Sequence, residues 1–260
     1  MPAEGRRRVL VSSFFARLFP SILKSAELIV FPSFCQLCSE LLQMPGERVV
    51  CRCCLESLIP HRASYCICCG RFFNGVSEPH VCSSCLENKR AYSRHRSGGL
   101  YQGKLKDVIL LYKYRQFKVL GKELADFICR SLDQDESLFP GTDLLVPVPL
   151  HPRKERKRGF NQAREIAVWL GEKHSIPCVG NVLVKTKNNA AQTTLESKQR
   201  WQNVKNAYTV KKPDLIAGKT VLLIDDVFTT GATIDECSRV LKKAGAREVR
   251  AITVAQAALN

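Results

Sequence analysis

The segment from Val221 to Thr233 joins a strand pattern, two adjacent acids and a loop of small residues. Four apolar residues precede Asp225 and Asp226, which is typical of an interior parallel strand, and helical periodicity resumes after Thr233. The acids and the loop therefore lie at the carboxyl end of a strand, where open α/β sheets bind ligands. The start of the next helix offers backbone N–H groups and the positive end of its dipole to a phosphate.

The residues of this loop can donate hydrogen bonds to an anion, whereas the two acids can accept them from a diol. Thr229, Thr230 and Thr233 supply hydroxyl donors, and Gly231, followed by Ala232, lets the backbone approach the anion because it has no Cβ. Donors for a phosphate beside acceptors for a vicinal diol predict a site for ribose 5-phosphate. The alternative is an ordinary strand-to-helix turn, in which a threonine caps the helix and the acids are solvated.

A second unusual segment, residues 151–162, follows the strand pattern at 144–149 and is expected to be a loop. It places five basic residues in six positions, again at the carboxyl end of a strand. Such charge can stabilise the negative charge that develops on a departing pyrophosphate. We expect contacts from Arg153, Lys154 and Arg158, the two arginines first, because a guanidinium binds phosphate oxygens in a bidentate manner. A solvated basic loop or a nucleic-acid patch is the alternative.

Ten of the 13 cysteines lie between Cys35 and Cys85, and eight of them form two copies of one spacing pattern. In each copy a Cys-x2-Cys pair is followed after 12 residues by a second pair, and the copies are 31 residues apart. Four thiolates spaced in this way form the tetrahedral shell of structural zinc, so the pattern predicts two zinc ribbons. The predicted ligands are Cys35, Cys38, Cys51 and Cys54 in the first ribbon and Cys66, Cys69, Cys82 and Cys85 in the second.

Other residues leave alternatives open in this region. Cys53 and Cys68 each neighbour a predicted ligand and could replace it after a slip of one residue, and His61 and His80 are further alternative ligands. A disulfide framework would need an oxidising compartment, which nothing in the sequence indicates. The ribbons contain little apolar material, so metal ligation is expected to supply much of their folding free energy. Their role is either structural support or contact with a protein or a nucleic acid.

Strand and helix patterns alternate after Cys85, which is typical of parallel βαβ units. We therefore expect an α/β fold with a mainly parallel sheet and flanking helices, preceded by a small zinc-ribbon domain whose metal sites each have four cysteine ligands. The expected divisions are an amphipathic leader at 1–34, a double zinc ribbon at 35–90 and the α/β domain at 91–260. The helical stripes are Leu105, Val108, Ile109 and Tyr112; Leu120, Leu124, Phe127 and Ile128; Ala163, Ile166, Ala167 and Leu170, in a helix capped by Asn161 and ending at Gly171; and Ile234, Cys237, Val240, Leu241 and Ala244.

The composition is that of a globular protein with one substantial core, at 260 residues and 45% hydrophobic content. The formal charge of +16 favours encounters with phosphorylated ligands or polyanions and says nothing about the fold. No apolar run approaches the roughly 18 to 20 residues that cross a bilayer, so a cytoplasmic protein is expected. Residues 6–15 only faintly resemble a signal peptide, because no small-residue cleavage site follows. Peripheral membrane contact by the leader is the alternative.

The segment at 221–233 resembles the phosphoribosyl pyrophosphate signature of type I phosphoribosyltransferases. Three further segments, 147–150, 158–162 and 192–203, narrow this resemblance to the competence protein F (ComF, ComFC) family of bacteria. That family joins an N-terminal zinc-ribbon region to a phosphoribosyltransferase-like domain and is associated with natural transformation, in which imported single-stranded DNA is handled. The likeness extends from about residue 28 to 256, and the extra Cys53 and Cys68 are the departure from it.

The resemblance implies that a nitrogen nucleophile displaces pyrophosphate at C1 of phosphoribosyl pyrophosphate, with Mg²⁺ bridging the pyrophosphate and the ribose hydroxyls. It assigns the diol and metal-bound water to Asp225 and Asp226, and the 5-phosphate to the loop Thr229–Thr233. The acceptor and the presence of activity stay open. In such enzymes a flexible loop closes over the substrate, and the polar segment 192–203 is either this flap or an exposed hairpin.

The alternative function is that of a non-catalytic competence factor, which uses the nucleotide pocket for regulation and binds single-stranded DNA or other competence proteins. Grooves for single strands combine positive charge with aromatic faces. Phe160, Trp201, Tyr112 and Tyr114 stand near basic residues in the sequence, which permits this alternative without requiring it.

Overall fold

The computed structural model describes residues 33–44, 47–61, 64–73, 78–133, 138–187 and 197–258. The chain divides into two compact units, Met1–Ser57 and Leu58–Asn260. The expected leader lies outside the described residues except for its last two positions. Among the described helices, none has the length and apolar character needed to cross a membrane.

The first unit is described around the first group of four cysteines. The Cys35 amide donates to the Glu40 carbonyl at 2.8 Å, which closes a tight turn that contains Cys38. Helix α2, Arg52–Glu56, begins after Cys51, whose sulfur accepts a hydrogen bond from an amide of the first turn. The buried aliphatic side chains among the described residues of this unit are Leu42, Val49 and Val50. So few buried apolar groups agree with the expectation that metal ligation contributes to its folding.

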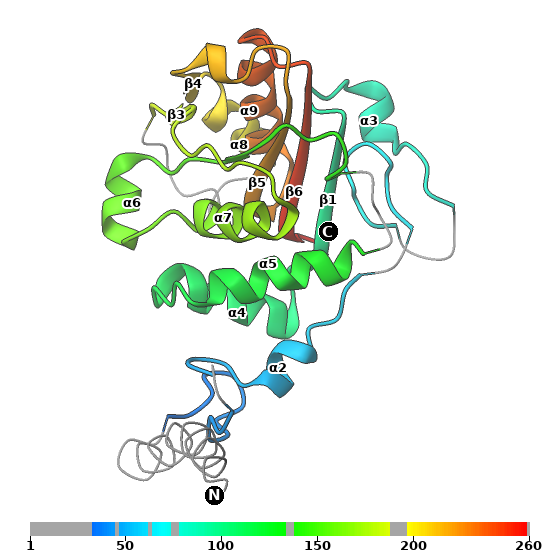
Figure 1. Cartoon of the computed structure of the whole chain (residues 1–260). Coiled ribbons are helices and arrows are strands. Elements are labelled where there is room, and N and C mark those ends of the chain that lie inside the picture. Colours follow the sequence, from blue (N-terminus) through cyan, green and yellow to red (C-terminus); the bar gives the residue numbers. More distant parts are fainter. Residues whose placement is uncertain are drawn as a thin grey trace, which may run out of the picture. The chain divides into compact units, whose positions relative to one another are not determined.

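The second unit is built on a sheet of four parallel strands in the order β1-β6-β5-β2 (Figure 1). Strand β5 lies inside the sheet, paired with β6 on one side and with β2 on the other. Its first five residues are all buried, as the apolar run at this position predicts. The strands are β1 Arg94–Leu100, β2 Leu144–Pro147, β5 Thr220–Phe228 and β6 Glu248–Gln256.

Helices cover both faces of this sheet. Helix α5 packs on β1 and β6, α7 packs on β2 and β5, and α9 packs on β5 and β6. Alternate residues of a strand point to opposite faces, and Val221 and Leu223 share one core with Cys237 and Leu241 of α9. The other face of β5 is therefore the one that α7 covers. The helices are α4 Gly103–Tyr114, which packs on α5, α5 Leu120–Ser131, α7 Gln162–His174 and α9 Ala232–Lys243.

Shorter elements complete the second unit. Strands β3 and β4 form a separate antiparallel pair, and both β4 and α8 pack against α9. The bounds are α3 Ser83–Glu87, α6 Pro152–Arg158, β3 Leu183–Lys185, α8 Ser197–Val204, β4 Tyr208–Val210 and a 3₁₀ turn at Pro213–Leu215.

The predicted helical stripes of α4, α5 and α7 are buried as expected. In α9 the members Ile234, Cys237 and Leu241 are buried, while Val240 and Ala244 are partly buried. The Asn161 side chain caps α7 by accepting a hydrogen bond from its second residue, as predicted. However, α7 continues past Gly171 to His174.

The basic segment expected to be a loop is largely a helix, α6, so that expectation was wrong. Pro152 occupies the first turn, where its missing N–H costs nothing, and the His151 side chain accepts a hydrogen bond from the Arg153 amide. Gly159, at a φ of 81°, ends the helix. The basic residues therefore point in several directions around a helix instead of lining one loop.

The second cysteine group folds with the sheet, so the two copies of the repeat lie in different units. The observed division after Ser57 thus differs from the one expected at residue 90. Strand β1 holds this group: the His95 amide and Nδ1 donate to the carbonyls of Cys68 and Cys69, both at 2.8 Å. The buried Arg96 guanidinium donates to the Ile67 carbonyl at 3.1 Å. Burial lowers the pKa of His95 to about 3, so its ring is neutral.

Candidate functional site

The loop between β5 and α9 is shaped by Gly231 and by the ring of Phe228. Gly231 directly precedes α9 at a φ of 81°, in the left-handed region that favours glycine. A Cβ at this position would lie 2.7 Å from Cζ of Phe228. The Phe228 ring in turn stacks on the buried His95 ring, with 4.0 Å between the centroids. This packing holds the turn that presents the first amides of α9 at the end of β5.

Asp225 and Asp226, at the end of β5, have different surroundings. An oxygen of Asp226 lies 2.7 Å from Nζ of Lys113 in α4, and the Lys113 and Asp226 side chains are 15% and 14% exposed. Asp225 accepts a hydrogen bond of 2.8 Å from the Asp226 amide. Burial and the neighbouring Asp226 carboxylate raise the pKa of Asp225 to about 7. Near neutral pH, Asp225 is therefore poised between its protonated and ionised forms.

The two acids line a cavity of about 400 Å³, a volume suited to a small molecule. Four cationic side chains from three elements line the same cavity: Lys113 of α4, Lys154 and Arg158 of α6, and Lys185 of β3. Acidic, hydroxyl and cationic groups thus meet in one cavity at the carboxyl end of the sheet. The predicted residues that line it are Asp225, Asp226, Thr229, Thr233, Lys154 and Arg158.

The remaining predicted residues lie elsewhere. Gly231 and Ala232 are buried within the turn, and Thr230 lines a second cavity on the same loop. The Thr230 hydroxyl also accepts a hydrogen bond from the Ala232 amide at 3.4 Å. Arg153 is exposed on α6 and is not among the described residues that line the first cavity. The expectation that Arg153 meets a ligand in this cavity therefore has no support from the geometry.

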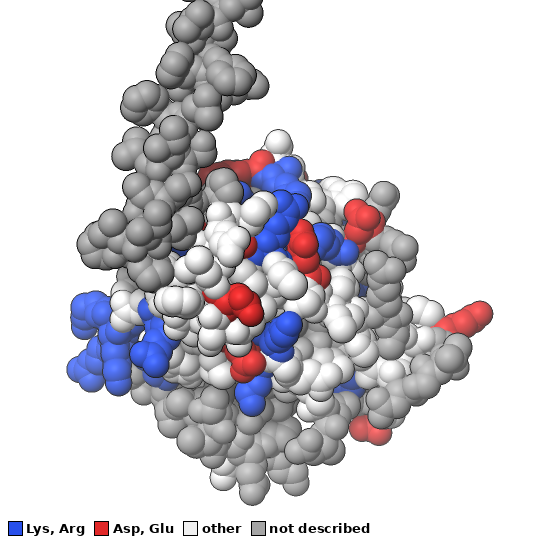
Figure 2. All heavy atoms as spheres, turned by 90° about the horizontal axis from the view of Figure 1, so that it is seen from below, with Lys and Arg blue, Asp and Glu red and all other residues white. Residues whose placement is uncertain are grey.

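Helix α6 divides its charges between the cavity and the surface. Arg158 donates from Nη1 to Oε1 of Gln162 at 2.9 Å, and its guanidinium lies 5.6 Å from the centroid of the Tyr114 ring. Burial, together with the charge of Arg158, lowers the pKa of Lys154. Arg153, Arg156 and Lys157 are exposed. Figure 2 shows Lys and Arg side chains gathered at the left edge of the molecule, the side on which α6 lies in Figure 1.

Lys113 and Lys185 line the cavity although no feature of the sequence indicated either residue. Neither belongs to a motif: Lys113 lies between Tyr112, which is buried, and Tyr114 in the last turn of α4, and Lys185 ends β3. Burial lowers the pKa of Lys185, whose Nζ lies 5.2 Å from the centroid of the Tyr208 ring. Only the folding of α4 and β3 toward β5 identifies these two cations as part of the site.

The segment 192–203 and the four aromatic residues also differ in part from what the sequence predicted. The segment 192–203 begins outside the described residues, and its second part is helix α8, where Trp201 packs partly buried against the core. Of the four aromatic residues expected near a nucleic-acid strand, Tyr112 and Phe160 are buried in the core. That part of the expectation was wrong, because both side chains are needed to fill the space between helices. Tyr114 is exposed.

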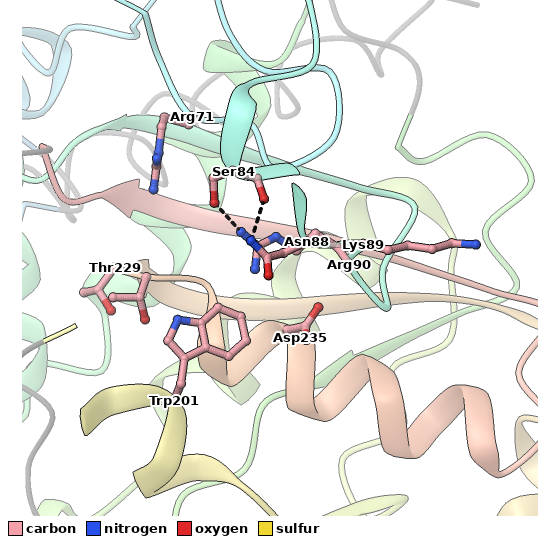
Figure 3. Close-up of a pocket in the computed structure, with 9 residues that line it drawn as sticks. Arg71, Ser84, Asn88, Lys89, Arg90, Trp201, Thr229 and Asp235 are labelled. Atoms are coloured by element: carbon pink, nitrogen blue, oxygen red, sulfur yellow. Dashed lines mark hydrogen bonds between the residues drawn. The ribbon is translucent and has the colours of Figure 1, made fainter. Parts of the chain in front are cut away.

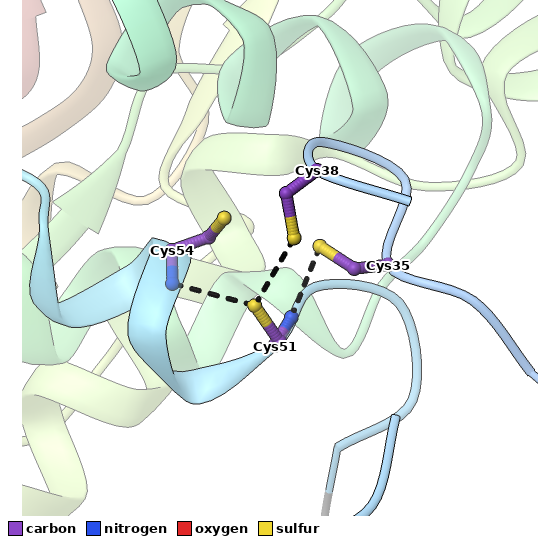
Figure 4. A group of neighbouring side chains, drawn as sticks. All are labelled: Cys35, Cys38, Cys51 and Cys54. Atoms are coloured by element: carbon purple, nitrogen blue, oxygen red, sulfur yellow. Dashed lines mark hydrogen bonds between the residues drawn. The ribbon is translucent and has the colours of Figure 1, made fainter. Parts of the chain in front are cut away.

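Both predicted groups of four cysteines are assembled, and within each group the sulfur atoms lie within 4.8 Å of one another. The Sγ atoms of Cys38 and Cys51 are 3.6 Å apart (Figure 4), and those of Cys69 and Cys82 are 3.8 Å apart. A tetrahedron with zinc–sulfur bonds of about 2.3 Å has edges of about 3.8 Å, whereas a disulfide requires about 2.05 Å. The two groups therefore fit zinc and do not form disulfides.

Hydrogen bonds favour the thiolate, the form that binds metal, at one cysteine of each group. The amides of Leu37 and Cys51 donate to the Cys35 sulfur at 3.4 and 3.3 Å. Burial raises the pKa of Cys35, but backbone amides outweigh burial and lower this pKa to about 6. In the second group the Cys69 thiol, with backbone amides, lowers the pKa of Cys66 to about 4. Cys53, Cys68, His61 and His80 belong to neither group.

A family model described as the phosphoribosyl transferase domain matches residues 157–258, which contain both β5 and the loop before α9. The chain is 29% identical to competence protein F of Haemophilus influenzae over 181 residues, covering 68% of this chain and 78% of that protein. It is 27% identical to the DNA utilization protein YhgH of Salmonella typhi over 231 residues, covering 86% of this chain and 96% of that protein.

Among solved structures, the chain is similar to the glutamine phosphoribosylpyrophosphate amidotransferase of B. subtilis complexed with ADP and GMP. The TM-score is 0.32 and the identity 25%, with 52% of this chain and 25% of that chain covered. This chain therefore spans only a quarter of the length of that amidotransferase.

Proposed function

Because the chain belongs to the competence protein F (ComF) family, we propose that it binds phosphoribosyl pyrophosphate with Mg²⁺ and acts in natural transformation. The observation that supports the ligand is the cavity at the end of β5, where two acids, two threonines and four cations meet. Phosphoribosyl pyrophosphate carries a diol flanked by two phosphorylated ends, and this cavity offers a partner for each of these parts.

We assign the 5-phosphate to the loop Thr229–Thr233, where hydroxyls and the first turn of α9 donate hydrogen bonds. We assign the ribose hydroxyls to Asp225 and Asp226, whose carboxylates accept hydrogen bonds. We assign the pyrophosphate to Lys154 and Arg158, the two residues of α6 that line the cavity. Each assignment follows the charge of the group: cations for the anionic end and carboxylates for the neutral diol.

Lys113 already neutralises the Asp226 carboxylate, because its Nζ lies 2.7 Å from an oxygen of that group. Carboxylate oxygens and water are the ligands that Mg²⁺ prefers, so Asp225 and Asp226 are the residues that would hold the ion, whose charge would offset that of the pyrophosphate. Entry of the ligand then releases Lys113 from its pair. We propose that Lys113 turns from Asp226 toward a pyrophosphate oxygen.

The same arrangement suits transfer of the ribosyl group. A nitrogen lone pair forms the bond to C1 while the C1–oxygen bond breaks, and the pyrophosphate leaves with that electron pair. Lys154 and Arg158 stabilise the charge on the departing oxygens, and the carboxylates favour positive charge at C1. The acceptor is left open, so the proposed class is a pentosyltransferase of unassigned acceptor.

The second candidate function is binding of single-stranded DNA by the outer side of α6. Its Arg153, Arg156 and Lys157 are exposed, and Tyr114, 62% exposed, lies beside Arg158. Single strands bind where cations track the backbone and aromatic rings meet the bases, and such binding weakens with salt. Arg153, Arg156 and Lys157 are not among the described residues that line the cavity, whereas Tyr114 and Arg158 do line it, so this surface adjoins the proposed ligand site.

For the cysteine groups we propose one zinc ion each, with a structural role. Thiolate ligands persist only where thiols stay reduced, and the proposed compartment is therefore the cytoplasm.

Calorimetric titration with Mg²⁺ and phosphoribosyl pyrophosphate tests the proposed function. The change Asp226→Asn should weaken binding at least about tenfold, because it removes one carboxylate charge from the ligand's diol and metal. The matched control is Arg153→Gln, which lies on α6 outside the cavity and should leave this affinity unchanged. Equal affinity of the wild type and Asp226→Asn would refute the assignment. Salt-sensitive oligonucleotide binding that Arg153→Gln weakens and Asp226→Asn retains would support the second candidate.

A further inference from the structure

A second cavity, of about 460 Å³, lies in the second unit beside the loop that follows β5 (Figure 3). Its lining comes from three regions that are far apart in the sequence: the segments around the second cysteine group, helix α8, and the loop together with the first turn of α9. Of its lining residues only Thr229 also lines the cavity that holds Asp225 and Asp226. The two cavities therefore have different linings and share Thr229 of the loop.

The charge of this cavity favours an anion. Arg71, Lys89 and Arg90 contribute three positive charges, against the single carboxylate of Asp235. That carboxylate is already engaged, because it accepts a hydrogen bond of 2.8 Å from the Ala91 amide. The net charge of the lining is thus positive, and it stands next to the hydroxyls of Thr229 and Thr230. In Figure 3 the Arg71 side chain points toward Thr229.

The Arg90 guanidinium forms part of the wall of this cavity. Its Nη2 donates to the Ser84 hydroxyl at 2.9 Å, while its buried Nε has no hydrogen-bond partner within the described residues. Because solvent does not reach this Nε atom, Arg90 acts on a ligand in the cavity through its positive charge.

The cavity also has an aromatic wall. The Trp201 indole lines it from α8, packed against the core of the unit and therefore held in place. The Arg90 guanidinium lies 5.2 Å from the centroid of this ring, so cation and ring are already held together. A cation, hydroxyl donors and a fixed aromatic ring around one space are suited to a ligand that joins a phosphate to a planar ring.

We propose that this second cavity binds one nucleotide unit, with its base against Trp201 and its phosphate between Arg71 and the hydroxyls of Thr229 and Thr230. The unit is either a free mononucleotide or one residue of a single strand, since both present the same phosphate and base. The proposal goes beyond binding of phosphoribosyl pyrophosphate and does not depend on it. A nucleotide bound here contacts Thr229, which also lines the cavity that holds the acids.

The chain offers a direct probe, because it contains only two tryptophans, Trp169 on α7 and Trp201. In the variant Trp169→Phe, Trp201 is the single tryptophan, and its fluorescence reports the second cavity. Adenosine 5′-monophosphate and a short oligothymidylate are titrated separately into this variant, with inorganic phosphate as the comparison. We expect saturable quenching by at least one of the two. Quenching by the mononucleotide identifies free nucleotides, and quenching by the oligonucleotide alone identifies a single strand.

Two further changes locate the binding. Adding Arg71→Gln to the Trp169→Phe background should weaken it about tenfold or more, the effect of removing one charged contact. Adding Asp226→Asn should leave it unchanged. Calorimetry on Trp201→Leu, checked for an unaltered melting temperature, should show about tenfold loss that Trp201→Phe restores. Absence of saturable quenching, quenching insensitive to Arg71→Gln, or quenching lost with Asp226→Asn would each overturn the proposal. The last result would place the nucleotide in the first cavity.

Discussion

Replacing Asp225 with asparagine should make the protein more stable and a weaker binder at the same time. The folded protein raises the pKa of this carboxyl from 3.8 to about 7, through burial and the Asp226 charge. A carboxyl with a raised pKa favours folding while it is protonated, and that contribution is lost as the pH rises from about 4 through 7. Asparagine keeps the acceptor for the Asp226 amide and never ionises. The variant therefore escapes the cost of a buried charge.

The size of this cost follows from the shift. A difference of about three pKa units corresponds to an upper limit of about 4 kcal/mol, and we expect about 2 kcal/mol because Asp225 is only partly buried. At pH 8, Asp225→Asn should raise the free energy of unfolding by this amount in urea denaturation. At pH 4 the wild type and the variant should be nearly equal, because the wild-type carboxyl is then protonated in the folded state.

Ligand binding should respond in the opposite sense. If the diol and Mg²⁺ require the ionised carboxylate, about a tenth of the protein is competent at pH 6 and about nine tenths at pH 8. The affinity of the wild type for phosphoribosyl pyrophosphate should therefore rise roughly tenfold across this range. The phosphate groups of the ligand also titrate near pH 6, and Asp225→Asn is the control that retains this contribution.

Titration calorimetry at pH 6, 7 and 8 tests this predicted pH dependence of the affinity. The wild type should show a steeper increase of affinity with pH than Asp225→Asn, and it should release protons on binding at pH 6. Identical pH profiles for the two proteins, or a variant that is less stable than the wild type at pH 8, would refute the reasoning about Asp225.

Two further predictions concern the metal groups and the turn before α9. Elemental analysis should find two zinc ions per chain. Cys66→Ser should lower the melting temperature of the second unit more than Cys35→Ser, because the second group belongs to that unit and is hydrogen-bonded to β1 through His95. Zinc-free protein with unchanged melting would contradict this. Gly231→Ala should lower the free energy of unfolding by about 1 to 3 kcal/mol, because Gly231 has a φ of 81° and an added Cβ would lie 2.7 Å from Cζ of Phe228. The same change should abolish binding of phosphoribosyl pyrophosphate. Gly218→Ala, at a φ of 71° with open space around it, is the matched control and should retain binding; equal loss in both variants would show that backbone strain alone is responsible.

The features that the sequence predicted well are contiguous in the chain. The apolar run of β5, the acids and the threonine–glycine turn form one unbroken segment, so their order already places them at the end of a strand. The cysteine spacing likewise defines both groups of four, because each pair lies within one tight turn or at the first turn of a helix. Periodicity gave the buried faces of α4, α5 and α7 for the same reason. Local geometry is sufficient for features of this kind.

The tertiary structure decided which distant residues meet. Lys113 pairs with Asp226 only because α4 folds back toward β5, and Trp201 stands beside Thr230 only because α8 packs on α9. It also separated Lys154 and Arg158, which line the cavity, from Arg153, which does not, because the segment is a helix and adjacent side chains point in different directions. No spacing rule encodes such contacts, since they depend on how whole elements pack and on which side chains that packing buries.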